Sequence, residues 1–271
     1  MPALVLGIAL VVAVSASAEP LATSFQIRTS LSAAQEVPTP TGNVSAASGS
    51  LTGTVMKEDS GAAISWSLAY SRLTGDATAA HIHRGGSGQT GPIGTFLCGP
   101  CASPISGTAR LDNATLAAIQ SGSAYVNVHT SMNPAGEIRG QVAITADIRT
   151  TLAPSQEVPR PKGNVRRATG RFTATVAKQS ATGTVTWLLR FSGLTGRAAA
   201  AHIHTGRVGR TGPVAVALCA PCRNGQRGTS NLSAATLAAL KVGRAYVNVH
   251  TAKNPGGEIR GQIRAVPLTI S

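Results

Sequence analysis

The stretch Ala-Tyr-Val-Asn-Val-His-Thr occupies residues 124–130 and returns without a change at residues 245–251. Polar and apolar side chains alternate along it, which is typical of a half-buried β-strand. In such a strand Tyr125, Asn127 and His129 lie on one face and the two valines on the other. The sequence therefore predicts the same strand twice in one chain.

The rest of the chain repeats at the same offset. Each copy spans roughly 120 residues, the usual size of one domain, and all six histidines fall inside the shared phrases. We predict two domains, residues 19–147 and residues 148–271. The phrases kept in both copies include Gln-Glu-Val-Pro (35–38 and 156–159), Leu-Thr-Gly (73–75 and 194–196), Ala-His-Ile-His (80–83 and 201–204) and Gly-Glu-Ile-Arg-Gly-Gln (136–141 and 257–262).

Both copies show the pattern of an all-β fold. Apolar residues alternate through Trp66 in the first copy and through Trp187 in the second, so both tryptophans are expected in a core. One short helix is expected per copy, capped by Asp112 or Asn113 in the first and by Ser233 in the second. We therefore predict two antiparallel β-sandwich or Greek-key-like domains, each with one short helix.

The N-terminus has the features of an export signal. An apolar run ends in Ala16-Ser17-Ala18, the small-residue pattern that signal peptidase cleaves, so residues 1–18 are predicted to be a signal peptide. A transmembrane anchor is the alternative, but the run is short for a bilayer and lacks a basic flank. We expect a secreted, periplasmic or cell-surface protein without a transmembrane anchor after cleavage.

Charge is divided unevenly between the copies. Residues 27–147 hold six Lys/Arg and seven Asp/Glu, whereas residues 148–271 hold eighteen and two. A basic exported surface favours anionic partners such as an acidic polysaccharide, a cell-wall polymer, lipid headgroups or a protein. Nucleic acid is disfavoured, because no recognition helix, zinc finger or aromatic RNA-binding strand accompanies the basic residues. Arginine accumulated for solubility is the alternative.

The histidines have the spacing of metal ligands. His81 and His83 are two residues apart, so on a strand they share a face while Ile82 points to the core. With His129 they make three imidazoles per domain, which suits a copper or zinc ion with an open coordination position. We predict one copper or zinc ion per domain, or else a purely structural role for the histidines. The predicted ligands are His81, His83 and His129 in the first domain and His202, His204 and His250 in the second.

Two further residue pairs are candidates around these sites. Glu137 and Glu258 follow the third histidine by eight residues and are expected either to orient an imidazole, to pair with a nearby arginine, or to cap the Asn-Pro turn. Each copy also has Cys-x-x-Cys, for which we predict disulfides Cys98–Cys101 and Cys219–Cys222. A redox-active thiol pair and a mixed His/Cys metal site are the alternatives. No catalytic residues are predicted, since the nucleophile elbow, the P-loop and the His-Glu-x-x-His motif are all missing.

Taken together, the phrases that the two copies share resemble the CHRD domain, a module named for chordin. The resemblance covers nearly all of the chain after residue 18, once per copy, and implies a β-rich extracytoplasmic module of the kind found in exported microbial proteins. The cysteine-rich von Willebrand type C domains that accompany the module in chordin have no counterpart here, so growth-factor antagonism is not implied. The His-x-His strand also resembles the copper strand of Cu,Zn superoxide dismutase, which uses more metal ligands than this chain offers.

Three functions are compatible with the sequence. The first is an exported, non-enzymatic binding protein with a three-histidine copper or zinc site in each domain. The second is an extracellular protein- or polysaccharide-interaction module that uses the basic face of the second domain, with structural histidines. The third, less favoured, is a dismutase-like copper redox enzyme.

Overall fold

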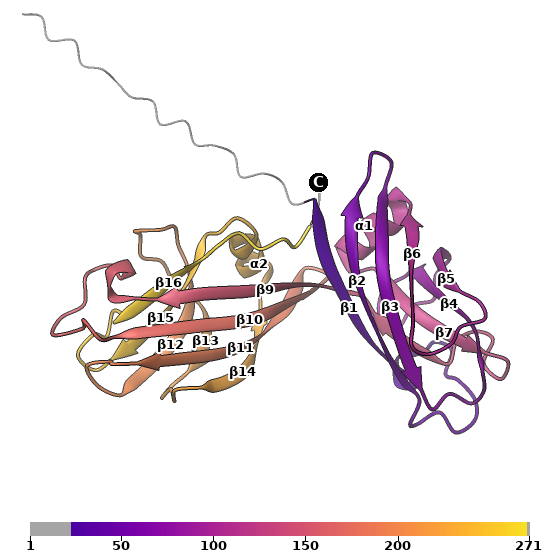
Figure 1. The fold of residues 1–271 in the computed structure, drawn as a ribbon, viewed down its shortest axis with the longest axis horizontal. Coiled ribbons are helices and arrows are strands. Elements are labelled where there is room, and N and C mark those ends of the chain that lie inside the picture. Colours follow the sequence, from indigo (N-terminus) through magenta and orange to yellow (C-terminus); the bar gives the residue numbers. More distant parts are fainter. Residues whose placement is uncertain (1–22, 270–271) are drawn as a thin grey trace, which may run out of the picture.

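The computed structural model describes residues 23–269, so the predicted signal peptide lies outside the described residues. Two similar β-rich domains lie side by side (Figure 1). Domain 1 contains β1–β8 and α1, and domain 2 contains β9–β16 and α2. The all-β prediction is thereby confirmed.

Domain 1 consists of eight strands, one α-helix and a short 3-10 helix, η1. Their bounds are β1 Ser24–Ser32, η1 Ala33–Gln35, β2 Ser48–Lys57, β3 Ala62–Ser71, β4 Ala77–Arg84, β5 Ile93–Cys98, β6 Ile105–Leu111, α1 Asn113–Ser121, β7 Ala124–Thr130 and β8 Ile138–Gln141.

Domain 2 repeats this order. Its bounds are β9 Ala143–Leu152, η2 Pro154–Gln156, β10 Thr169–Gln179, β11 Thr182–Ser192, β12 Ala198–Thr205, β13 Val214–Cys219, β14 Gln226–Leu232, α2 Ala234–Lys241, β15 Ala245–Thr251 and β16 Ile259–Ile263.

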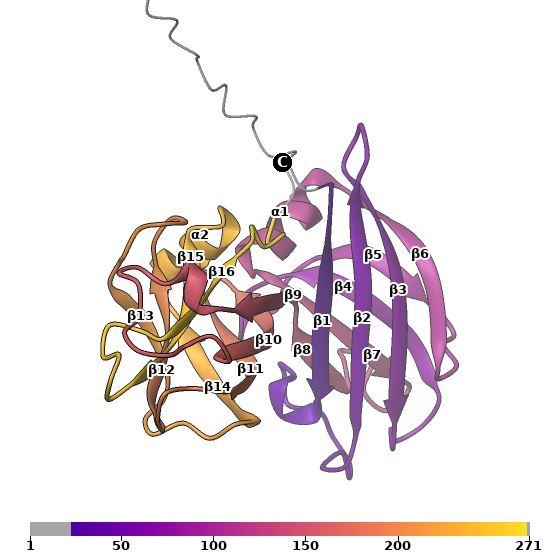
Figure 2. The ribbon, with the colours of Figure 1, turned by 60° about the vertical axis from the view of Figure 1, so that its left-hand side comes forward.

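Each domain is built from two antiparallel layers. In domain 1 the layers are β1-β2-β3-β6 and β8-β7-β4-β5, and in domain 2 they are β9-β10-β11-β14 and β16-β15-β12-β13. Figure 2 shows β1, β2 and β3 in front of β4, β5 and β7. Both layers supply alternate side chains to the core, as the period-2 patterns predict.

The two tryptophans are core residues, as expected. Trp66 is 5% exposed and Trp187 is 4% exposed. Each lies opposite a glycine on the neighbouring strand, Gly107 or Gly228. A Cβ at Gly107 would come within 2.8 Å of the Trp66 ring, so the indole packs directly over the backbone.

The two helices begin where the capping residues predict. The Asp112 side chain accepts a hydrogen bond from the Thr115 amide at 2.6 Å, and Ser233 accepts one from Thr236 at 3.2 Å. α1 ends at Ser121, and the next residue, Gly122, has a positive φ of 78°, which suits glycine. Neither helix of the described residues is long and apolar enough to cross a membrane.

Strand β9 joins the two domains. Its first residues pair with β1 on one side and with β10 on the other, so that Ile144 lies opposite both Ile27 and Lys178. One sheet therefore runs through both domains. The boundary predicted between residues 147 and 148 falls inside β9 and stays a prediction.

Candidate metal centre

The three histidines of each domain meet on the outer face of one layer, β8-β7-β4-β5 in domain 1 and β16-β15-β12-β13 in domain 2. Strand pairing places His81 opposite Asn127 and His83 opposite Tyr125, while His129 lies opposite Ala79. The intervening Ile82 points into the core, where it is fully buried. Each histidine offers one ligand atom, and the three atoms lie within 4.8 Å of one another.

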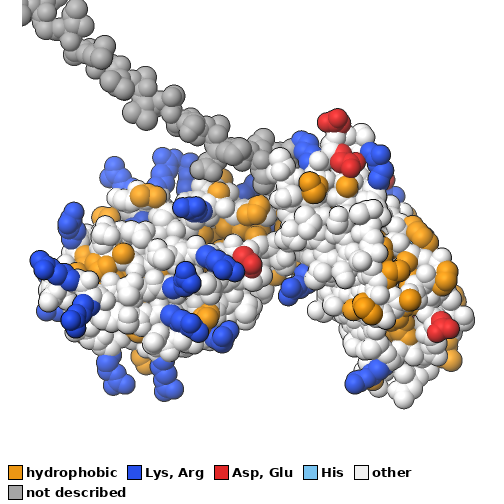
Figure 3. Space-filling model, in the orientation of Figure 1, with side chains coloured by type: hydrophobic (Ala, Val, Ile, Leu, Met, Phe, Trp, Pro, Cys, Tyr) orange, Lys and Arg blue, Asp and Glu red, His pale blue; other side chains and the backbone are white. Residues whose placement is uncertain are grey.

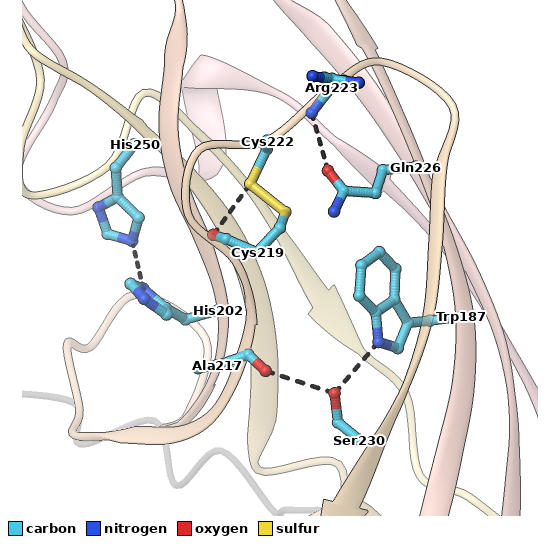
Figure 4. The surroundings of a disulfide bond; sticks show 9 residues. All are labelled: Trp187, His202, Ala217, Cys219, Cys222, Arg223, Gln226, Ser230 and His250. Carbon is cyan, nitrogen blue, oxygen red and sulfur yellow. Dashed lines mark hydrogen bonds between the residues drawn. A yellow bond between two sulfur atoms is a disulfide. The ribbon is translucent and has the colours of Figure 1, made fainter.

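Domain 2 repeats this geometry closely. The Nδ1 atom of the first histidine lies 3.0 Å from the Nε2 atom of the third in both triads, between His81 and His129 and between His202 and His250. The ring centroids of His81 and His83 are 5.5 Å apart, and those of His202 and His204 are 5.6 Å apart. Figure 4 shows His202 and His250 pointing toward each other.

Backbone carbonyl groups determine which ring nitrogens carry hydrogen. His83 Nδ1 lies 2.9 Å from the Gly91 oxygen, and His129 Nδ1 lies 3.0 Å from the Pro134 oxygen. Because a carbonyl oxygen only accepts, both Nδ1 atoms donate, and in the neutral rings both Nε2 atoms keep their lone pairs. The lone pair of His129 then accepts the hydrogen bond from His81 Nδ1.

One buried ring nitrogen in each triad lacks a well-formed hydrogen bond. It is Nε2 of His83 in domain 1 and of His204 in domain 2. The side-chain amides of Asn127 and Asn248 interact with these two rings and favour their protonated form. The Oδ1 atoms of Asn127 and Asn248 are also buried without a hydrogen bond. Leaving a buried polar atom unpaired is costly, and in each triad such an atom lies where the ligand atoms of three histidines converge.

The imidazoles are held in their neutral form. Burial, reinforced by the neighbouring His129 and His83, lowers the pKa of His81 from 6.5 to about 4. Burial also lowers the pKa of His83 and of His129. The pKa values of the three counterparts, His202, His204 and His250, are lowered in the same way. A neutral imidazole is the form that binds a metal ion.

A stack of side chains across three strands supports the second histidine. The His83 ring stacks on Tyr125 at 4.9 Å between centroids, and the Arg139 guanidinium lies 3.4 Å from the Tyr125 ring centroid. The Tyr125 hydroxyl accepts a hydrogen bond from the Gly91 amide at 3.2 Å. His204, Tyr246 and Arg260 form the same stack in domain 2. Rotation of the His83 ring is therefore restricted.

The loop between β4 and β5 is tied to this stack. Arg139 donates to the Gly86 carbonyl and Gln141 donates to the Gly85 carbonyl, both at 2.8 Å. The loop in turn presents the Gly91 carbonyl to His83. Sequence reasoning missed Arg139, Gln141 and Gly91 as supports of the site, although all three are kept in both copies.

The two glutamates, Glu137 and Glu258, make their hydrogen bonds to threonine and asparagine residues in or beside nearby turns. Glu137 is fully buried, and its carboxylate accepts hydrogen bonds from Thr74, Thr130 and Asn133. Burial raises the pKa of Glu137, but these hydrogen bonds outweigh it and hold the pKa below its usual value. Glu258 has the equivalent partners Thr195, Thr251 and Asn254. The glutamates thus hydrogen-bond the turns beside the site, and the hydrogen-bond partners of the His83 and His129 Nδ1 atoms are backbone carbonyls.

The cysteines form disulfides in the predicted pairs. Cys98 is bonded to Cys101 and Cys219 to Cys222. Each bond closes a loop beside the histidine strand, since Ala80 and Ala201 pair with Cys98 and Cys219. Within residues 23–269, the groups able to hold a metal consist of histidines alone.

Comparison with protein families agrees with the repeat. The model of the CHRD domain matches residues 27–142 and again residues 148–263. The chain belongs to the CHRD domain family. Each CHRD domain contains one complete histidine triad. No match was found among curated proteins or among solved structures.

Proposed function

We propose that this tandem CHRD protein is an exported, non-enzymatic metal-binding protein that holds one copper or zinc ion in each domain. The ligands are His81 Nδ1, His83 Nε2 and His129 Nε2, and their counterparts in His202, His204 and His250. The convergence of one ligand atom from each of the three histidines, all within 4.8 Å of one another, carries the proposal, and the buried Nε2 atoms of His83 and His204 support it. A metal ion satisfies these lone pairs and replaces the hydrogen bond between the first and third histidines.

The donor set selects the class of metal. Imidazole nitrogen suits copper and zinc, whereas calcium and magnesium require oxygen ligands. Three protein ligands leave a coordination position open. Asn127, whose buried Oδ1 lacks a hydrogen bond, lies opposite His81 on the neighbouring strand. The two disulfides are consistent with an oxidising compartment, and export places the protein in the periplasm, at the cell surface or outside the cell.

Elemental mass spectrometry on protein purified without a histidine tag tests the proposal. We expect two equivalents of copper or zinc per chain in the wild type. The variant His81→Ala/His83→Ala should keep one equivalent, as should His202→Ala/His204→Ala, and the fourfold variant should keep none. Each double variant controls for the other, because it leaves one domain untouched.

Circular dichroism shows whether each variant is folded. A folded wild type that contains no metal and takes up neither copper nor zinc on dialysis contradicts the proposal and favours structural histidines. Superoxide turnover that disappears with the metal would instead identify the dismutase-like activity.

A further inference from the structure

Four arginines lie on the outer face of the β9-β10-β11-β14 layer, one on each strand. They are Arg149, Arg171, Arg190 and Arg227, and all four are exposed. We refer to these four residues as the arginine face. Lys and Arg side chains gather over this half of the molecule in Figure 3, where domain 1 shows few.

The strand register places the four arginines in two adjacent rows. Arg171 lies directly opposite Arg190. Arg149 and Arg227 end the next row, with Thr173 and Leu188 between them. With neighbouring strands about 4.8 Å apart, this row is about 14 Å long. The positive charge therefore forms a band across the whole layer.

The fold gains nothing from this arrangement. Like charges directly opposite each other on antiparallel strands destabilise a sheet. Within residues 23–269 the two salt bridges are Arg84–Asp112 and Arg110–Glu58, so neither involves the arginine face. The nearest acidic residue on strand β9 is Asp147, two residues before Arg149, and its side chain accepts a hydrogen bond from Thr175.

Domain 1 shows that the same layer forms without these charges. The positions equivalent to Arg149, Arg171, Arg190 and Arg227 hold Arg28, Ser50, Ala69 and Ser106. The layer β1-β2-β3-β6 has the same pairing with a single arginine among these positions. The three additional charges of domain 2 thus require an explanation outside the fold.

We propose that the arginine face binds an anionic polysaccharide that carries carboxylate or sulfate groups along an extended chain. The guanidinium fork matches the oxygens of such groups in a bidentate manner. Shallow depressions lie along the face, one lined by Arg149 and Arg227 and another by Arg171 and Arg190. Threonine hydroxyls between the arginines offer hydrogen bonds to sugar hydroxyls.

The surroundings of the face disfavour other partners. Single-stranded nucleic acid needs aromatic side chains on which bases stack, and protein interfaces have an apolar centre. Within residues 23–269 the large exposed hydrophobic side chains are Met56, Ile93, Phe96, Met132, Val208, Val214 and Val242, and these four strands contain none of them. The polysaccharide proposal is independent of the metal site.

Surface plasmon resonance of the full-length protein on immobilised heparin and polygalacturonate tests the proposal. The variant Arg171→Ser/Arg190→Ala/Arg227→Ser introduces the residues of domain 1. The control Arg160→Thr/Arg166→Ser/Arg210→Gln also introduces the residues of domain 1 and removes the same charge, but from loops outside the four strands.

We expect the face variant to bind at least one of the two polymers about tenfold more weakly, with a shallower dependence of affinity on salt, and the control to stay within about twofold. The melting temperature of the face variant should equal or exceed that of the wild type. Equal losses in the two variants would assign binding to diffuse charge and overturn the proposal. The proposal is also overturned if the wild type binds neither polymer. It is overturned as well if the wild type binds single-stranded DNA or phosphatidylserine vesicles more tightly than it binds the polymers.

Discussion

At His83, the direction of one hydrogen bond determines which nitrogen is available to a metal. The Gly91 carbonyl fixes the hydrogen on Nδ1 and leaves the lone pair on the buried Nε2 atom. His129 is fixed in the same way by Pro134. Only His81 has to exchange its hydrogen between ring nitrogens when a metal binds, so the site is largely preorganised.

The lowered pKa of His81 predicts acid sensitivity of the metal-free protein. Between pH 6.5 and about pH 4 the unfolded chain binds a proton that folded His81 does not. The free energy of unfolding should therefore fall as the pH falls through this window. We expect a loss of about 1–2 kcal/mol after allowing for solvent screening of this half-buried group, measured by urea unfolding after chelation.

The variant His81→Gln is the control for this measurement. It lacks the titrating group, so its stability should depend less on pH over the same range. Glu157 titrates with the opposite sign, since burial raises its pKa to about 6, and it is present in both proteins. Identical pH profiles for wild type and variant would contradict the prediction.

At the level of elements, the site depends on the loop between β4 and β5. A Cβ at Gly91 would lie 1.7 Å from the Arg84 carbonyl oxygen, and one at Gly212 would lie 1.6 Å from that of Thr205. No side chain fits at either position without moving the loop. Glycine is therefore required where the loop returns to the histidine strand.

We expect Gly91→Ala to displace the Gly91 carbonyl from His83 and to weaken metal binding in domain 1 about tenfold or more. Isothermal titration of the chelated protein with zinc measures this. The control is Gly75→Ala, because no atom lies within 4 Å of a Cβ at Gly75. Unchanged zinc affinity in Gly91→Ala would show that the carbonyl does not orient the ligand.

Local sequence patterns predicted the strands and helices better than they predicted which residues of different elements contact one another. The alternation through Trp66 and the cap at Asp112 are encoded within a few residues, so the strand and the helix could be predicted from sequence. The pairing of His81 with Asn127 depends on register between distant strands, which no local pattern specifies. The same holds for Glu137, whose partner Thr74 is 63 residues away.

At the level of the whole molecule, β9 pairs with a strand of each domain, β1 in domain 1 and β10 in domain 2. Residues 144–147 pair with β10, and Ile144 is fully buried. A fragment of residues 148–271 lacks these contacts, whereas a fragment of residues 143–271 keeps them. The first residues of β9 therefore pair with β10 as well as with β1.

We expect the fragment of residues 143–271 to be more stable than that of residues 148–271 by about 2–4 kcal/mol, because Ile144 and its ladder hydrogen bonds are restored. Thermal unfolding followed by circular dichroism compares them. Equal melting temperatures would support the boundary predicted between residues 147 and 148.

The shared strand also has a geometric consequence. A flexible linker lets two domains adopt a range of separations. Here the continuous backbone pairing from β1 through β9 to β10 restricts the motion of one domain relative to the other. The two histidine triads are then held at one separation and in one relative orientation. A partner that engaged both sites would therefore have to match one spacing and one relative orientation.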